Sequence, residues 1–399
     1  MKKILLLAVF AVFAVFVVIA VPVWLMLSPS VIAPVAWQPP AAPPLTGPYA
    51  ANDVLKGLQR LAVGVGEGPE GLAVDATGRV YAGYLDGRVI RLSADGGSYV
   101  ELANTGGRPL GIGFGPDGGL VVADAKKGLL HIGSKPQADV LATEADGLPL
   151  GFTDDVDSAR LSKEVYFTDA SSKFPFPYYL KDLLEHRPHG RLLSYNVETR
   201  QTKTLLSDLY FANGVAVGPD DAYVLVNETA AYRIVRYWLK GARAGTHDIF
   251  IDNLPGFPDN LSFNGRDRFW VALPSLRDPQ LDALAGRPLL RKLMARLPGR
   301  VQGWLQSGKP KHSFVLGLDL NGHVVVNLQY AGEDAYAPIT SVEERGPWLY
   351  FGSFSERAIA RLPLNRIDPD TPPPAAGWEN APARPVVAAR SKSETEEDD

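Results

Sequence analysis

The chain has 399 residues, of which 46% are hydrophobic and 21% charged, and its 39 glycines and 33 prolines are typical of a globular protein with many turns. Its formal net charge of −4 argues against a nucleic-acid-binding surface, which is normally basic. The absence of cysteine excludes disulfides, thiolate nucleophiles and zinc sites with cysteine ligands.

The N-terminal segment has the pattern of a membrane anchor. Lys2 and Lys3 precede an uncharged stretch from residue 4 to residue 27, and about 20 apolar residues are enough for a helix to span a bilayer. We expect residues 1–28 to form an uncleaved transmembrane helix with a cytoplasmic N-terminus, which places the rest of the chain on the periplasmic side, or on the lumenal or extracellular side. A long, cleaved signal peptide is the alternative. Residues 29–51, rich in Pro and Ala, are expected to be an extended spacer.

One pattern recurs six times between residues 52 and 366. Each unit has a short apolar strand, a turn rich in Gly, Asp or Asn, and a second strand of β-branched or aromatic residues. The strand pairs are expected at 71–75 with 80–82, 111–114 with 120–124, 156–157 with 165–169, 214–217 with 223–227, 261–263 with 269–272, and 339–342 with 348–352. Most units continue into a second hairpin, so that each has four strands. The pattern predicts an all-β, six-bladed β-propeller that follows the N-terminal transmembrane helix.

The two ends of the repeat region should close the ring. The last unit ends after residues 358–362, one strand short, and residues 57–63 are expected to supply that strand, which removes an exposed sheet edge. Beyond the repeats, residues 367–399 are rich in Pro and Ala and then acidic. They cannot bury a core, and we expect a disordered acidic tail.

Two insertions interrupt the repeat, at residues 171–189 and 276–310. The first contains Phe174, Phe176, Tyr178 and Tyr179, which we expect to line a substrate pocket together with residues of the second insertion. Such a lining would suit aromatic or acyl substrates better than sugar lactones. The alternative is that these aromatic side chains only pack the loop.

Four polar residues occupy the same place in different units, at or just before an inner strand: Glu70, Asp154, Asn213 and Asp259. The inner strands of a propeller run along its central channel, so equivalent strand ends meet on one face. Carboxylate and amide oxygens that converge there suit a hard cation, and calcium best. Each motif alone is usually only a turn, but four in phase with the repeat predict a metal site.

The quoted motifs also resemble a known family. Residues 68–75, 165–172, 211–216 and 256–260 are similar to the signatures of the strictosidine synthase-like proteins, which include the adipocyte plasma membrane-associated protein-like group. The wider superfamily contains gluconolactonases and paraoxonases. The resemblance covers about residues 52–366 and implies a propeller with a catalytic calcium ion bound by Glu70, Asp154, Asn213 and Asp259.

Two residues depart from the family pattern. The family usually has Asn-Asp where this chain has Asp154-Asp155, and the extra carboxylate could tighten calcium binding or leave one carboxyl protonated. Plant strictosidine synthases carry a catalytic Glu about where this chain has Thr340, and a threonine cannot act as that base. The synthase activity should therefore not be inherited with the family name.

The leading hypothesis is calcium-dependent hydrolysis of a small ester or lactone, of the arylesterase or lactonase type. Asp259 is the expected catalytic residue, because the related lactonases use the Asp of this motif at the metal, and Asn260 is expected to orient substrate. The non-catalytic alternative is a propeller that binds a partner and holds a structural calcium ion. Synthase-type condensation is a third hypothesis, weakened by Thr340.

Overall fold

The computed structural model describes residues 16, 19–20, 30–297, 310–371 and 387–388. The expected membrane anchor at residues 1–28 lies almost entirely outside these residues, as does most of the expected acidic tail. Among the described residues, no helix has both the length and the apolarity needed to cross a membrane. The chain divides into two compact units, a large one of residues 40–179, 188–277 and 310–399, and a small one of residues 1–39, 180–187 and 278–309.

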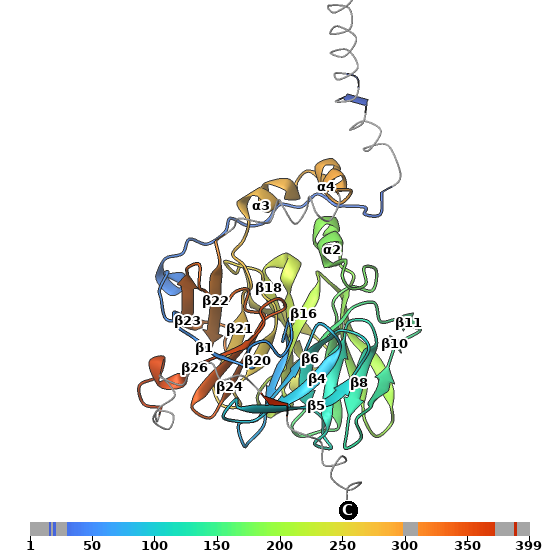
Figure 1. The fold of residues 1–399 in the computed structure, drawn as a ribbon. Helices are drawn as coiled ribbons and strands as arrows, with labels where there is room; N and C mark the ends of the chain where they lie inside the picture. Colours follow the sequence, from blue (N-terminus) through green and yellow to red (C-terminus); the bar gives the residue numbers. More distant parts are fainter. Residues whose placement is uncertain (1–15, 17–18, 21–29, 298–309, 372–386, 389–399) are drawn as a thin grey trace, which may run out of the picture. The chain divides into compact units, whose positions relative to one another are not determined.

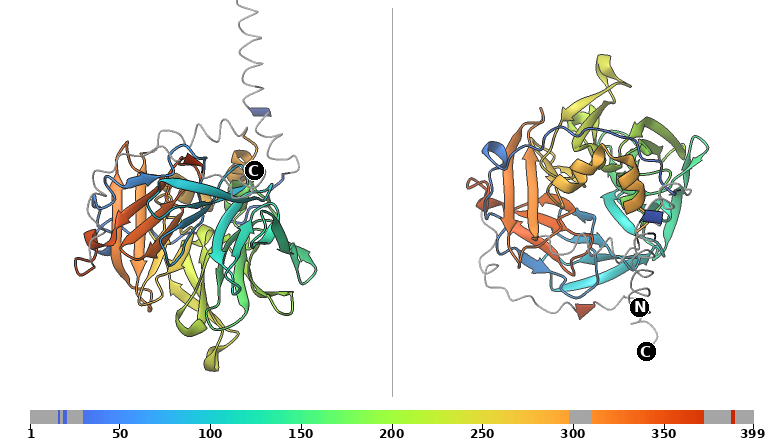
Figure 2. Two further views of the ribbon diagram at one scale, coloured as in Figure 1. Left: turned by 60° about the horizontal axis from the view of Figure 1, so that its bottom comes forward. Right: turned by 90° about the horizontal axis from the view of Figure 1, so that it is seen from above.

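The large unit is a six-bladed β-propeller, as predicted, with its blades arranged in a ring around a central axis (Figures 1 and 2). Each blade is a four-stranded antiparallel sheet whose first strand is innermost. The first three blades are β2 (Leu72–Val74), β3 (Val80–Gly83), β4 (Arg88–Leu92) and β5 (Ser98–Asn104); β6 (Pro109–Phe114), β7 (Leu120–Asp124), β8 (Gly128–Ile132) and β9 (Ala138–Ala142); and β12 (Thr153–Ser158), β13 (Glu164–Asp169), β14 (Gly190–Asn196) and β15 (Gln201–Leu209).

The next two blades are β16 (Ala212–Val217), β17 (Tyr223–Glu228), β18 (Arg233–Trp238) and β19 (His247–Ile251); and β20 (Leu261–Phe263), β21 (Phe269–Ala272), β22 (His312–Leu318) and β23 (Val324–Ala331). The sixth has β24 (Ser341–Arg345), β25 (Trp348–Gly352) and β26 (Ile359–Pro363). A small hairpin of β10 (Glu144–Ala145) and β11 (Leu148–Pro149) follows the second blade, and β27 (Val387–Ala388) pairs in parallel with β5.

The ring closes with a strand from the start of the repeat region. β1 (Gln59–Leu61) pairs antiparallel with β26, with Gln59 opposite Arg361 and Leu61 opposite Ile359. This strand is the fourth of the sixth blade, and it lies where the sequence predicted it. The closure joins the two ends of the propeller in one sheet and leaves the sixth blade with the same four strands as the others.

The core lies between blades. Each of the six apolar clusters of the described residues joins two neighbouring blades, and the cluster between blades five and six contains the fully buried Trp270. Strands that are covered on both faces carry continuous apolar runs instead of an alternating pattern. The run Leu120–Asp124, buried at all five positions, is such a strand.

The small unit is built from segments far apart in the sequence. It contains most of α2 (Tyr179–Glu185), with α3 (Pro279–Ala285) and α4 (Pro288–Met294). Residues 30–39 hold these helices together: the backbone N–H of Val35 donates to the carbonyl of Glu185, and that of Trp37 to the carbonyl of Ala285. Trp37 also stacks on His186, with ring centroids 3.8 Å apart. The expected spacer is thus, over residues 30–39, an ordered part of a small helical unit.

Candidate metal centre

Irregularities at the start of two inner strands direct the predicted donors into the channel. The register of β12 against β13 shifts between Thr153 and Val156, and that of β16 against β17 shifts between Ala212 and Val215. Asp154 and Asn213 lie within these two bulges. Bulges turn side chains away from the regular alternation and are common beside functional sites. They explain why two polar side chains can point inward at the start of otherwise apolar strands.

Glycines next to two donors allow neighbouring inner strands to approach closely. A Cβ atom on Gly71 would lie 1.8 Å from the carbonyl oxygen of Leu110, and one on Gly214 would lie 2.5 Å from that of Asp259. The Glu-Gly and Asn-Gly pairs of the sequence therefore reflect packing between blades. This close approach brings the donors of adjacent blades to the same end of the channel, which we call the donor end.

The four predicted donors are buried together at the donor end. Glu70, Asp154, Asn213 and Asp259 are all between 3% and 7% exposed. The pKa of Asp154 is raised well above its usual value, by burial first and then by the charges of Glu70 and Asp259. Burial and the charge of Glu70 likewise raise the pKa of Asp259, although a hydrogen bond with Asn213 opposes the shift. The three carboxylates are therefore buried close enough to influence one another's charge.

Asn213 contributes an oxygen without a hydrogen-bond partner. Its side chain is hydrogen-bonded to Asp259, while its Oδ1 atom is buried and unpaired. A buried amide oxygen without a partner is costly unless something else binds it. The backbone around Asp259 is held firmly: Asn227 donates to the carbonyl of Asp259, and Thr229 Oγ1 donates to that of Pro258 at 2.6 Å.

Arg108 is a member of this site that sequence reasoning missed. It is 1% exposed, and its guanidinium donates to Glu70 Oε2 at 2.6 Å and to the carbonyl of Gly68 at 2.8 Å. Arg108 tends to lower the pKa of Glu70, but burial outweighs it and the net shift is upward. Arg108 directly precedes the second inner strand, but the residue in phase with the four donors is Leu110, two positions later. The repeat pattern therefore gave no signal for Arg108, and only its contact with Glu70 identifies it.

Two further acids, Asp155 and Asp157, continue from Asp154 along β12 into the channel. Asp155 accepts the backbone N–H of Val215 at 2.9 Å, and Asp157 accepts that of Val217 at 2.8 Å, so both link β12 to β16. Burial raises the pKa of Asp155 to about 8. The expectation that the extra carboxylate would favour a protonated carboxyl agrees with the direction of these shifts.

The donor set fits a hard cation. The donors are carboxylate and amide oxygens, the three neighbouring carboxylates have one buried arginine as counter-charge, and one amide oxygen is unpaired. Calcium prefers such ligands and takes six to eight of them. Within the described ranges, no group of three His, Cys, Asp or Glu side chains is arranged to hold a metal ion by itself. The fit therefore depends on Asn213 and on the Glu70 oxygen that Arg108 does not contact.

The residues expected to contact substrate lie in different environments. Asn260 is 4% exposed, and neither atom of its side-chain amide has a hydrogen-bond partner. Phe174 is buried with its ring edge-on to His189. Phe176 packs edge-on to Phe152, whereas Tyr178 is 49% exposed.

Tyr179, in the same insertion, is close enough to the metal donors for their charges to affect its pKa. Burial, and then the charges of Glu70 and Asp259, raise the pKa of its phenol. Tyr179 is also 40% exposed, and it was among the four aromatic residues that the sequence analysis expected to line the pocket.

Thr340 stands at the start of the sixth inner strand. It is fully buried, its carbonyl accepts the N–H of Asn260 at 3.0 Å, and its Oγ1 atom has no hydrogen-bond partner. It therefore adjoins the donor end, in phase with the donors of the other blades. A hydroxyl there can accept or donate a hydrogen bond but cannot serve as a base at neutral pH.

The acidic cluster predicts an unusual pH dependence of stability. A free Asp titrates near pH 3.9, whereas Asp155 titrates near 8 in the folded protein. Between these values the folded state binds a proton that the unfolded state has lost, so stability falls as pH rises, by up to about 1.4 kcal/mol per pH unit for one group. Urea unfolding at pH 5 to 8 in a chelator should show this slope. Asp155→Asn should reduce it, whereas Asp139→Asn on the outer strand β9 should not; stability that rises over this range would contradict the prediction.

Comparisons with known proteins agree with this architecture. Residues 154–242 match the strictosidine synthase family, and residues 47–92 match the N-terminal region of strictosidine synthase-like proteins. The chain is 37% identical over 325 residues to the protein strictosidine synthase-like 6 of Arabidopsis thaliana, which covers 79% of this chain and 84% of that protein. It is 33% identical over 364 residues to the adipocyte plasma membrane-associated protein of Rattus norvegicus, covering 86% and 96%.

Solved structures share the fold at lower identity. A gluconolactonase from Xanthomonas campestris superposes with a TM-score of 0.55 at 16% identity, over 84% of this chain and 99% of the other. The calcium-binding protein regucalcin from Agrobacterium tumefaciens superposes with a TM-score of 0.52 at 16% identity, over 78% and 93%. At this level of identity the likeness establishes the fold.

Proposed function

The chain belongs to the strictosidine synthase-like family, and from this premise we propose that it is a calcium-dependent hydrolase of small esters or lactones. The observation that carries the proposal is the donor end itself. Three buried carboxylates lie close together there beside an amide oxygen that has no partner. The gluconolactonase fold of structural neighbours, and the calcium binding named for one of them, support the same chemistry.

Glu70, Asp154, Asn213 and Asp259 would hold the ion. When bound, calcium would polarise the carbonyl of an ester or lactone and stabilise the negative charge that develops on its oxygen. Arg108 holds one oxygen of Glu70 and thereby fixes the orientation of that carboxylate. The same guanidinium adds a buried positive charge beside the site.

We assign Asp259 the role of accepting the proton from the attacking water. In the metal-free site, burial and the charge of Glu70 raise the pKa of Asp259, whereas a bound calcium ion would lower it. The proton would go to the Asp259 oxygen that the ion does not hold. The hydrogen bond with Asn213 keeps the Asp259 side chain oriented toward the donor end. Asn260 and Tyr179 are the polar groups available to orient substrate.

Three of the six histidines are held by other partners and do not compete for the role of base. His131, on β8, pairs with Asp117, and His312, on β22, contacts Gln329. His323, in the turn after β22, pairs with Asp319. All three lie on third strands or their turns, away from the inner strands that line the channel. Thr340, in place of the synthase glutamate, argues against condensation chemistry.

We further propose that residues 1–28 hold the propeller at a membrane, on the periplasmic, lumenal or extracellular side. The relatives named as plasma membrane-associated support this location. The small-molecule substrate would then be met at that side of the membrane.

The experiment that tests the proposed function is hydrolysis of phenyl acetate and a panel of small lactones by the full-length protein in detergent. We expect turnover with calcium, loss of turnover after chelation, and recovery when calcium returns. Calcium binding without turnover across the panel would favour the non-catalytic alternative, in which the ion is structural and the propeller binds a partner.

A further inference from the structure

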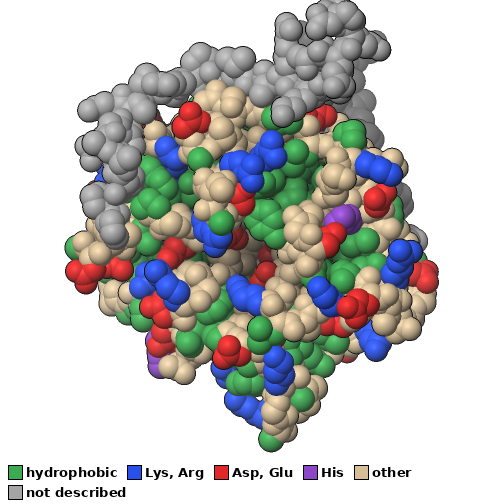
Figure 3. All heavy atoms as spheres, turned by 90° about the horizontal axis from the view of Figure 1, so that it is seen from below, with side chains coloured by type: hydrophobic (Ala, Val, Ile, Leu, Met, Phe, Trp, Pro, Cys, Tyr) green, Lys and Arg blue, Asp and Glu red, His purple; other side chains and the backbone are tan. Residues whose placement is uncertain are grey.

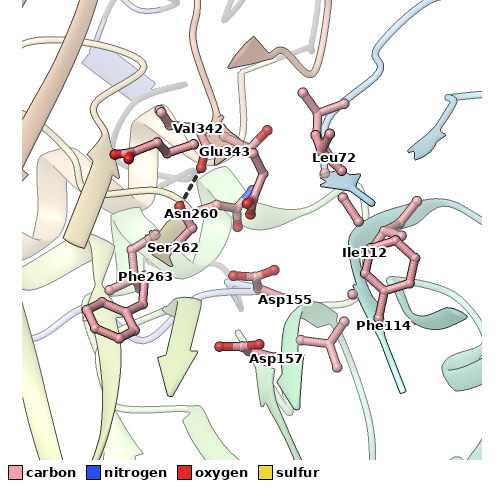
Figure 4. A pocket seen from close by; sticks show the side chains of 18 of the residues that line it. Leu72, Ile112, Phe114, Asp155, Asp157, Asn260, Ser262, Phe263, Val342 and Glu343 are labelled. Carbon is pink, nitrogen blue, oxygen red and sulfur yellow. Dashed lines mark hydrogen bonds between the residues drawn. The ribbon is translucent and has the colours of Figure 1, made fainter. Parts of the chain in front are cut away.

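A cavity of about 250 Å³ lies among the inner strands of the propeller. We call it the acidic channel and define it by Asp155, Asp157, Asn260 and Glu343 (Figure 4). Its lining also includes the exposed residues Arg160 and Arg345, which mark its mouth. Seen from below, the face of the propeller is hollowed at its centre, with acidic side chains within the hollow and Lys or Arg side chains at its rim (Figure 3). A water molecule occupies about 30 Å³ of liquid, so the channel can hold several.

The inner end of the channel adjoins the metal donors through the chain itself. Asp155 follows the donor Asp154, and Asn260 follows the donor Asp259. The outer end is open, because Arg160, Gly265 and Arg345 line it and are exposed. The channel is thus open to solvent at one face, and two of its lining residues, Asp155 and Asn260, each follow a metal donor in the chain.

The channel has an excess of carboxylates over cations along its walls. The pKa of Glu343 is raised well above its usual value, by burial first and then by Asp157 and Asp155. Arg160 and Arg345 tend to lower the pKa of Glu343 but donate to the backbone carbonyls of Val217 and Asp75. Both arginines thus stay at the mouth, and the lining residues of the interior include no cation to offset the charge of these carboxyls when they ionise.

Asn260 marks the junction between the channel and the metal centre. Its amide is buried, lines the channel, and has no hydrogen-bond partner on either its oxygen or its nitrogen. A buried amide is normally hydrogen-bonded, and one that faces a polar cavity without a partner is a ligand position for water or a cation. This observation is independent of the acidic side chains.

We propose that the acidic channel is the path by which the divalent cation reaches and leaves the metal centre, from the face opposite the donor end. When its carboxyls are ionised, the channel is a cleft lined by one sign of charge, which concentrates counter-ions and raises their rate of association about 10- to 1,000-fold. Groups that bind a passing ion weakly and in succession speed its transit without trapping it. Asp157 and Glu343 near the mouth, and Asp155 and Asn260 near the centre, form such a succession. The proposal rests on the calcium site of the proposed function.

The test is the kinetics of calcium exchange in the full-length protein, measured by stopped flow with a fluorescent chelator. The double variant Asp157→Asn/Glu343→Gln is expected to slow calcium association and release by about 10-fold each. Its dissociation constant should change by less than about threefold, since a path alters both rates together. Association by the wild type should also weaken with salt more steeply than association by the variant.

The matched control is Asp139→Asn/Glu333→Gln, two exposed acids outside the channel whose replacement changes the net charge equally. Glu343→Gln alone keeps Asp157, which accepts the backbone N–H of Val217 on β16. This single variant replaces the double variant in the test if the double variant does not fold. Rates equal to those of the control would overturn the proposal. So would faster release with unchanged association, because the channel carboxylates would then be part of the binding site itself. Absence of any calcium binding by the wild type would instead refute the proposed function.

Discussion

Asp259→Asn is expected to lower kcat/KM for phenyl acetate by roughly 100- to 10,000-fold, the usual contribution of a positioned general base. Asparagine has the same shape and can still accept the hydrogen bond from Asn213, but it cannot take a proton from water. Steady-state kinetics at saturating calcium would measure the loss. Asp267→Asn, in the exposed turn after β20, is the matched control and should retain wild-type activity.

Loss of a base can be separated from loss of the metal by a second variant. Asn213→Ala removes a neutral donor oxygen, so it should weaken calcium binding while it retains the Asp259 carboxylate. Raising calcium should restore much of the activity of Asn213→Ala and little of that of Asp259→Asn. If Asp259→Asn with bound calcium retains activity within about threefold of wild type, Asp259 is not the base.

Arg108→Met is expected to destabilise the metal-free protein by about 3–5 kcal/mol. The substitution leaves Glu70 buried without its arginine partner, and an uncompensated buried charge carries this cost. Urea unfolding in chelator measures the effect. Millimolar calcium should restore stability to Arg108→Met more than it stabilises the wild type, because the ion supplies the missing counter-charge.

The double variant Arg108→Met/Glu70→Gln completes the cycle. With both charges removed, we expect most of the lost stability to return, because no carboxylate then lacks a partner. A single variant that loses less than about 1 kcal/mol would show that the Arg108–Glu70 pair has little energetic importance. A double variant as unstable as the single one would show that Arg108 acts through packing instead of charge.

The propeller could be predicted because each blade is encoded by a short, local sequence pattern that repeats. Each inner strand and its partner are short apolar runs separated by a turn, and the same signals recur six times. The closing strand β1 followed from counting, since the sixth blade needs a fourth strand and residues 57–63 were available. The four donors share a phase in the repeat, and the structure brings them together.

Contacts between distant segments were not predictable in the same way. Residues 30–39 have the composition of a spacer, and their order depends on Glu185 and Ala285, which lie some 150 and 250 residues away. Arg108 has no motif of its own, and its role appears only once its side chain is seen to reach Glu70. The aromatic residues of the insertion look equivalent in sequence. Only in the folded protein do the charges of Glu70 and Asp259 act on the phenol of Tyr179.

The channel acids illustrate a third limit. Asp155 and Asp157 belong to a strand in which alternate positions point inward, but the bulge between Thr153 and Val156 shifts that alternation. Glu343 comes from the sixth blade, nearly 190 residues later, and nothing in its neighbourhood marks it as a channel residue. Charge that gathers along an axis is a property of the closed ring and becomes visible only when all six inner strands are in place.

The measurement that tests the central claim most directly is the initial rate of phenyl acetate hydrolysis by chelator-treated full-length protein as free calcium is restored. We predict that the rate rises from background and saturates at the same calcium concentration at which binding saturates, and that Asp259→Asn stays at background throughout. A rate that is unchanged by chelation, or that stays at background while calcium binds, would contradict a catalytic metal centre at the donor end.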